Sequence, residues 1–144
     1  MDTHLGQIRA SNNLLCATLA VYHDAAQRFG LSDGELNILY ALCELGNGSN
    51  QSALFRRMGM EKSTGNSAIH RLCRKGLLTL KPGQGRNVCV FFTPEGESLA
   101  NRTAHRLLEL ENEIYAQWSP EEWTQYLALN QRFLDALKEK VRTL

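Results

Sequence analysis

Residues 61–78, EKSTGNSAIHRLCRKGLL, bring hydroxyl, amide, imidazole and basic side chains together in one short stretch. Hydroxyl and amide groups can donate and accept hydrogen bonds at the edges of DNA bases, and cations suit phosphates. Ser63 suits a helix N-cap and Gly76 suits the end of a helix, so the stretch predicts a helix. Its buried stripe would include Ile69 and Leu72, which leaves the polar residues on an exposed face.

The residues that we expect to contact DNA combine polar groups for base edges with cations for phosphates. They are Lys62, Ser63, Thr64, Asn66, Ser67, His70, Arg71, Arg74, Lys81 and Arg86. Arg86 lies on a glycine-flanked loop, where a mobile arginine could enter the narrow minor groove. Each residue taken alone has an ordinary alternative as a solvated side chain. Their combined order along the chain is what favours DNA binding over that alternative.

The elements that must position these residues follow from the spacing of apolar residues and glycines. They are a short helix over roughly 50–58, a helix over 62–76, strands over 77–81 and 88–92, and a hairpin loop over 82–87. Gly59 and Met60 would form a tight turn between the two helices, which makes a helix-turn-helix. The hairpin would form a wing behind it. Gly65 is unusual inside a helix, and it could permit close packing against the helix over 50–58.

Further helices are predicted on both sides of this segment. They cover 5–29, a segment that begins at the capping box Ser32-Asp33-Gly34-Glu35, 94–118 and 120–142. The predicted fold class is therefore mainly α. A single domain over 1–144 would consist of a winged helix-turn-helix DNA-binding lobe over 32–93 and a helical dimerisation region formed by 1–31 and 94–144. The alternative is that the outer helices pack only within one chain.

The charge distribution agrees with a polyanionic partner. Residues 32–93 carry eight cations against four anions, whereas 94–144 carry six cations against nine anions. A localised basic segment suits DNA better than a uniformly basic protein would. The hydrophobic fraction of 43% is ordinary for a globular protein. The sequence predicts neither a membrane span nor a signal peptide, so we expect a cytoplasmic protein.

At this point the sequence resembles the MarR family of bacterial transcriptional regulators over nearly its whole length. The matching stretches are LSDGELNILYALCE (31–44), EKSTGNSAIHRLCRKGLL (61–78) and GRNVCVFFTPEGESL (85–99). The resemblance implies a homodimeric repressor that binds a pseudo-palindromic duplex, because one helix-turn-helix reads only a few base pairs. The family wing commonly has an aspartate two residues before the arginine that corresponds to Arg86. This sequence has Gln84 there, and Gly65 also replaces a larger residue.

The resemblance also implies control by an effector, for which three routes stay open. A small aromatic or amphipathic ligand could bind a crevice lined by Tyr22, His23, Phe29, Tyr40 and His105, although each of these residues also suits the core. Cys16 follows a leucine on the first helix, as the sensing cysteine of peroxide-responsive relatives does. The tyrosines of those relatives have no counterpart, since the matching positions are Ala20 and Gly30. Zinc at His105, Glu109 and His23 lacks a fourth donor.

Other classes of protein are less well supported by the sequence. Motifs for a nucleophile elbow, a zinc protease, a P-loop or a dinucleotide loop are absent, so we expect no enzyme and no cofactor. A winged helix can also serve protein–protein contacts. The cations of the middle segment favour DNA over such a module.

Overall fold

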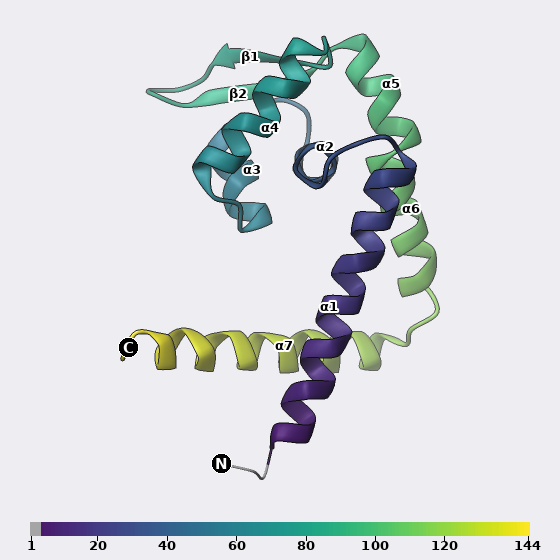
Figure 1. The fold of residues 1–144 in the computed structure, drawn as a ribbon, viewed down its shortest axis with the longest axis vertical. Coiled ribbons are helices and arrows are strands. Elements are labelled where there is room, and N and C mark those ends of the chain that lie inside the picture. The colour runs from purple at the N-terminus through teal and green to yellow at the C-terminus, as the bar shows by residue number, and fades with distance from the viewer. Residues whose placement is uncertain (1–3) are drawn as a thin grey trace. The chain divides into compact units, whose positions relative to one another are not determined.

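The computed structural model describes residues 4–144 and contains seven helices and one hairpin within them. Its elements are α1 (Leu5–Arg28), α2 (Asp33–Leu45), α3 (Gln51–Met58), α4 (Lys62–Arg74), β1 (Leu78–Pro82), β2 (Val88–Phe92), α5 (Pro94–Arg102), α6 (Ala104–Tyr115) and α7 (Pro120–Val141) (Figure 1). The chain divides into two compact units after Leu107. The mainly α class with a winged helix lobe is confirmed. Residues 1–3, the start of the predicted dimerisation region, lie outside the described part.

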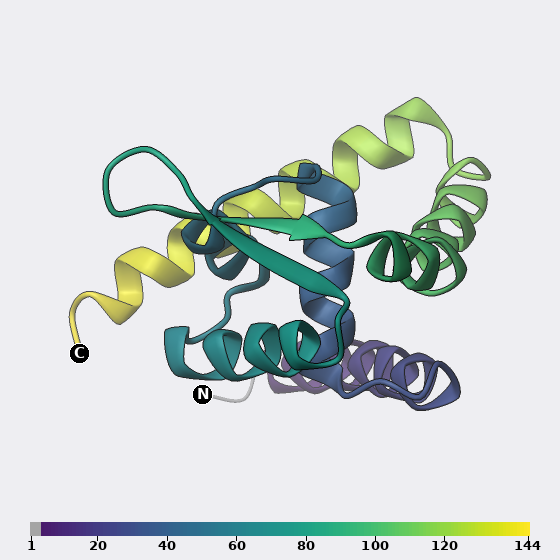
Figure 2. The same ribbon diagram turned by 90° about the horizontal axis from the view of Figure 1, so that it is seen from above.

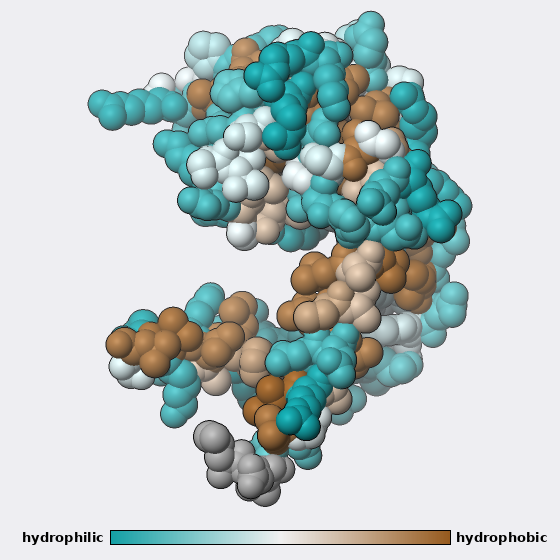
Figure 3. Space-filling view, in the orientation of Figure 1, coloured by the Kyte–Doolittle hydropathy of each residue, from teal (hydrophilic) through white to brown (hydrophobic). Residues whose placement is uncertain are grey.

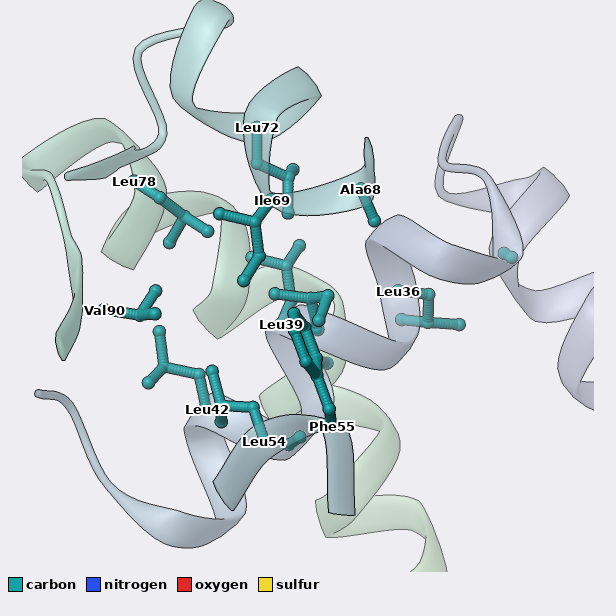
Figure 4. Close-up of a cluster of buried hydrophobic side chains, with 14 residues drawn as sticks. Leu36, Leu39, Leu42, Leu54, Phe55, Ala68, Ile69, Leu72, Leu78 and Val90 are labelled. Carbon is teal, nitrogen blue, oxygen red and sulfur yellow. The ribbon is translucent and has the colours of Figure 1, made fainter. Parts of the chain in front are cut away.

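The core of the first unit surrounds α2. Its largest fully buried side chains come from α2, α3, α4 and the strand β2, and they are Ile38, Leu39, Leu42, Leu54, Ile69, Leu72 and Val90. Figure 4 shows these apolar side chains converging between the helices and the hairpin. Burying one such side chain stabilises the fold by about 1.5–3 kcal/mol. The core therefore packs both α4 and the wing against α2 and α3.

The predicted capping box begins α2. The Ser32 hydroxyl accepts from the backbone N–H of Glu35, and the Glu35 carboxylate accepts from the backbone N–H of Ser32, each at 3.1 Å. In α3 the side chain of Asn50 accepts from the backbone N–H of Ala53 at 2.7 Å. Gly59 then ends α3 in the left-handed conformation, at φ 59°. Such a position favours glycine because other residues are strained there.

The N-terminus of α4 differs from the prediction. The N-cap is Glu61, and Ser63 lies inside the first turn, where its carbonyl accepts from the Ser67 hydroxyl at 3.0 Å. The cause is the early start of the helix, since the backbone N–H of Gly65 already donates to the Glu61 carbonyl at 2.9 Å. The predicted stop at Gly76 is confirmed. Gly76 has a positive φ of 72°, and the following N–H returns to the Leu72 carbonyl, which is a Schellman motif.

The wing is an antiparallel pair in which Leu80 lies opposite Val90. The segment before α3 also joins this hairpin. The backbone N–H of Gly48 donates to the Val90 carbonyl at 2.8 Å, and the Val90 N–H donates to the Ser49 carbonyl at 2.9 Å. The loop between α2 and α3 is therefore bonded to the base of the wing by its main chain, a connection that the sequence pattern did not reveal.

The single helix predicted over 94–118 is wrong. Thr93 caps α5, but the helix is interrupted at Thr103, which has a ψ of −91°. The buried Thr103 hydroxyl donates to the Leu99 carbonyl at 2.7 Å. Such bonds from a threonine to the preceding turn bend helices. The second segment, α6, ends at Tyr115, so residues 116–118 are not helical.

The second unit, residues 108–144, is held together at its helical turn by aromatic side chains. The ring centroids of Tyr115 and Trp123 lie 4.2 Å apart, and those of Trp118 and Trp123 lie 4.8 Å apart. The Trp123 indole N–H donates to the Tyr115 carbonyl at 3.1 Å. Ser119 and Glu122 form a capping box at the start of α7. The hydrogen bonds that Glu122 accepts from Ser119 lower the pKa of its carboxyl group.

The apolar stripes predicted on the outer helices are largely uncovered in a single chain. No residue of α7 is buried, and Phe133 is 69% exposed. On α1 only Ala26 is buried, whereas Leu14 is 72% exposed. Figure 3 shows hydrophobic residues along α7 and α1, whereas the surface over α4 and the wing is mostly hydrophilic or neutral. Exposed apolar surface of this extent is typical of an interaction site.

Candidate nucleic-acid interface

The helix α4 presents a polar face to solvent. Gly65, Ala68, Ile69 and Leu72 form its buried side. The opposite side carries exposed residues at three- and four-residue spacing, and these are Ser63, Ser67, His70 and Arg74. Four predicted DNA-contacting residues thus share the face that points most directly away from the core. A helix with such a face fits the width of a major groove.

A groove of about 660 Å³ lies between α3, α4 and the wing. The residues predicted from the sequence that line it are Lys62, Asn66 and His70 from α4 and Arg86 from the wing. Figure 2 shows the loop of the hairpin projecting from the lobe, beyond the paired strands. The structure therefore brings Arg86 and one flank of α4 to the same groove, although sixteen or more residues separate them in the chain.

Four further polar residues line this groove that the sequence analysis did not place in the site. They are Gln51, Ser52, Arg56 and Asn87. The outward position of Arg56 on a short basic helix was the available signal. Gln51 donates a hydrogen bond from Nε2 to Oδ1 of Asn66, so the two amides form a pair across the helix-turn-helix. Nothing in the spacing alone reveals this pair, because it depends on how α3 packs on α4.

Two basic residues, one in α4 and one just after it, bond to the N-terminal end of α2. The ammonium of Lys75, the C-cap residue of α4, donates to Oε2 of Glu35 at 2.6 Å. Burial alone would raise the pKa of Glu35, but the hydrogen bonds from Lys75 and Ser32 outweigh it and the pKa lies below its ordinary value. Arg71 donates to the Ser32 hydroxyl at 3.5 Å. Thr64 lies seven residues before Arg71 and shares its flank of α4.

The remaining predicted residue, Lys81, lies on the outer face of the wing. Its ammonium is 4.9 Å from the centroid of the Phe91 ring, a distance at which a cation is attracted by the ring. At the tip, the Gln84 carbonyl accepts from the backbone N–H of Asn87 at 3.2 Å. The tip is therefore closed by a main-chain turn in which Gln84 takes part.

The residues proposed to line an effector crevice have mixed environments. Phe29 and Tyr40 pack against the core of the first unit, and Tyr22 is half-buried on α1. His23 donates from Nδ1 to both carboxylate oxygens of Asp33, at 2.8 and 2.9 Å. His105 is exposed near the start of α6. A ligand role for these five residues stays a prediction.

The cysteines differ in their exposure to solvent. Cys16 is exposed on α1, and all four cysteines, each within the described residues, are free thiols. Burial raises the pKa of Cys43 to about 11 and also raises the pKa of Cys73, so both thiols are poor nucleophiles. Between residues 4 and 144 no three or more His, Cys, Asp or Glu side chains form a cluster that could hold a metal ion.

None of the helices in the described range is both long enough and apolar enough to cross a lipid bilayer.

Three helices followed by a hairpin, with a polar helix beside a basic loop, define a winged helix-turn-helix protein. A model of the MarR family matches residues 29–86, which include α2, α3, α4, the strand β1 and most of the hairpin loop. The predicted resemblance to the MarR family is thereby confirmed, with its match in the winged helix lobe. No curated protein matches the sequence.

Solved structures extend the likeness in fold to nearly the whole chain. NMB1585, a MarR family regulator from Neisseria meningitidis, is 18% identical and has a TM-score of 0.80, with 96% of each chain covered. PcaV, a transcriptional regulator from Streptomyces coelicolor solved with its natural ligand, is 24% identical, with a TM-score of 0.63 and 94% of each chain covered. BpsR from Bordetella bronchiseptica, whose DNA binding is regulated by 6-hydroxynicotinic acid, is 18% identical, with a TM-score of 0.62 and coverage of 86% of this chain and 98% of its own.

Proposed function

We propose that this protein is a transcriptional regulator that binds a pseudo-palindromic DNA operator as a homodimer, most simply as a repressor. The observation that carries the proposal is the groove between α3, α4 and the wing, where Lys62, Arg56 and Arg86 gather beside the exposed polar face of α4. Cations at the margins of a polar helix supply the phosphate contacts and base contacts that sequence-specific binding needs. The family match lies over these same elements.

The dimer follows from the uncovered apolar stripes of α1 and α7. A second copy would cover this surface and place two reading helices on one duplex. Half-sites about 34–36 Å apart would then be read together. The chain offers no catalytic motif that favours an enzyme, and a protein–protein module would not need the cations of the groove.

A fluorescence-anisotropy titration tests the proposal. The full-length protein is titrated onto duplexes from the region upstream of its own gene, at low and at moderate salt, with a shuffled duplex as the control. We expect tight, sequence-selective binding that weakens steeply as salt rises, because bound phosphates release counterions. Equal affinity for the shuffled duplex, or binding that does not respond to salt, would contradict it.

We further propose that an effector modulates this binding. The support is that the structural neighbour PcaV was solved with its natural ligand and that DNA binding by BpsR is regulated by 6-hydroxynicotinic acid. A small aromatic or amphipathic molecule is the first candidate, and oxidation at the exposed Cys16 is the second. Release of the labelled duplex by an aromatic acid, compared with release by peroxide from wild-type protein and from Cys16→Ser, separates the two.

A further inference from the structure

We propose that Gln51 is a positioning residue, which holds the amide of Asn66 so that its Nδ2 donors face the DNA. The inference rests on the proposed function and adds to it a residue that neither the sequence motifs nor the comparisons identify. Its ligand is a hydrogen-bond acceptor on the duplex, either a phosphate oxygen or an acceptor atom on a base edge.

The orientation of Asn66 follows from the chemistry of the pair. An asparagine amide has an acceptor oxygen and a donor nitrogen on opposite branches of one planar group. Gln51 donates from Nε2 to Oδ1 of Asn66. The oxygen branch is therefore directed toward α3, and the nitrogen branch is left for the groove that both residues line.

The packing below the pair keeps Gln51 in place. Gln51 and Phe55 are four residues apart on α3 and therefore share one face of that helix. Phe55 is buried against Gly65, which is the neighbour of Asn66 in the chain, and a Cβ atom on Gly65 would overlap the Phe55 ring. The first turn of α4 thus approaches α3 closely at two consecutive residues. A side chain supported in this way loses little conformational freedom when it binds.

The charges around the pair favour an acceptor as the ligand. Lys62, Arg56 and Arg86 line the same groove, and their side chains can only donate hydrogen bonds. A phosphate or base acceptor that these cations attract would be repelled by an exposed amide oxygen. With Oδ1 turned toward Gln51, the Nδ2 group of Asn66 adds one more hydrogen-bond donor to those of the three cations.

A double-mutant cycle on the full-length protein tests this role. Gln51→Met removes the donor without adding charge, and Asn66→Ala removes the amide. Each single variant is expected to weaken binding to the selected duplex about two- to tenfold, the worth of one hydrogen bond. The double variant should bind no more weakly than Asn66→Ala, since Gln51 acts through Asn66. The inference would be overturned if the fold-loss in affinity of the double variant equalled the product of the two single losses. It would also be overturned if Asn66→Ala bound the duplex as tightly as the wild type.

A second pair of variants gives an independent measurement. Gln51→Glu cannot donate to Oδ1, so the Asn66 amide should turn and present its oxygen to the DNA. Ser52→Glu adds the same charge to the same turn of α3, one residue away from the Gln51 side chain that bonds to Asn66. Gln51→Glu should weaken binding more than Ser52→Glu does, and the excess should vanish in an Asn66→Ala background. Equal losses from the two glutamates would contradict the inference, and thermal melts of each variant exclude misfolding.

Selection from a randomised duplex library identifies the acceptor. If Asn66 contacts a phosphate, Asn66→Ala lowers affinity equally for all sequences. If it contacts a base edge, the preference at one base pair is lost. Wild-type protein that binds no duplex would remove the proposed function and this inference together. Wild-type binding with multiplying losses would remove the inference alone.

Discussion

The ring of Phe55 occupies the space in which a side chain on Gly65 would project, so α3 and α4 meet at a residue without a Cβ atom. Gly65 is itself buried within α4. A glycine in a helix costs about 1 kcal/mol relative to alanine, and here the close approach of Phe55 explains its presence. This contact therefore helps to set the distance between α3 and α4.

The variant Gly65→Ala should disturb that contact. Inserting a methyl group into a packed core costs about 1–3 kcal/mol, against which alanine gains about 1 kcal/mol of helix propensity. We expect a net loss of roughly 1 kcal/mol, measured by chemical denaturation, together with weaker DNA binding. Gly6→Ala is the matched control, because nothing lies within 4 Å of a Cβ atom there. A Gly65→Ala protein as stable as the control would contradict this explanation.

The buried carboxylate of Glu35 should make stability depend on pH. Because its pKa is lowered in the folded state, its contribution is present above the ordinary carboxyl pKa and is lost as pH falls through the folded value. We expect Glu35→Gln to lower stability by about 1–2 kcal/mol at neutral pH and to flatten the acid side of the profile of melting temperature against pH. Glu139→Gln, which alters an exposed pair with Arg142, should leave the profile unchanged.

The two arginines Arg74 and Arg86 should differ in what they contribute to binding. Arg86→Ala removes a wing cation, so affinity should fall for all sequences and the slope of log Kd against log salt should decrease by about 1. Arg74→Ala alters the exposed face of α4 and, if this arginine reads a base, should relax specificity by about 1–3 kcal/mol. Arg132→Ala on α7 serves as the control for lost charge. Unchanged affinity in both interface variants would reject this surface.

The exposed leucine Leu19 on α1 tests the proposed dimer. A glutamate within an apolar interface would be buried without a partner, which is strongly unfavourable. Leu19→Glu should therefore shift the protein from dimer to monomer in size-exclusion chromatography with light scattering, while the helical signal is kept. Gln27→Glu, an exposed polar position on the same helix, should remain dimeric. A monomeric wild type would contradict the proposed assembly.

Local sequence signals predicted most of the elements, because caps and glycines act over a few residues. The capping boxes at Ser32 and Ser119 and the stop at Gly76 lie where their spacing indicates. The break at Thr103 was missed because threonine is compatible with a helix until its hydroxyl bonds to the preceding turn. Ser63 was misassigned because serine suits an N-cap, whereas the N-cap of α4 is Glu61, two residues earlier.

Local sequence signals predicted only part of the candidate interface. Residue type and helical spacing place Ser67, His70 and Arg74 on one exposed face. The pairing of Gln51 with Asn66 and the engagement of Lys75 by Glu35 depend on contacts between helices. Such contacts join residues far apart in the sequence, and no local pattern encodes them.

The main-chain bonds between the segment before α3 and β2 should limit how the proposed interface adapts to DNA. Main-chain bonds of Gly48 and Ser49 to Val90 connect the loop before α3 to β2, which should restrict movement of the wing relative to α3. Only the loop over 83–87 lies beyond the paired strands. If the protein binds DNA as proposed, we expect the loop to accommodate most differences in groove width between operators, and a duplex with an unfavourable minor groove would have to deform to be bound.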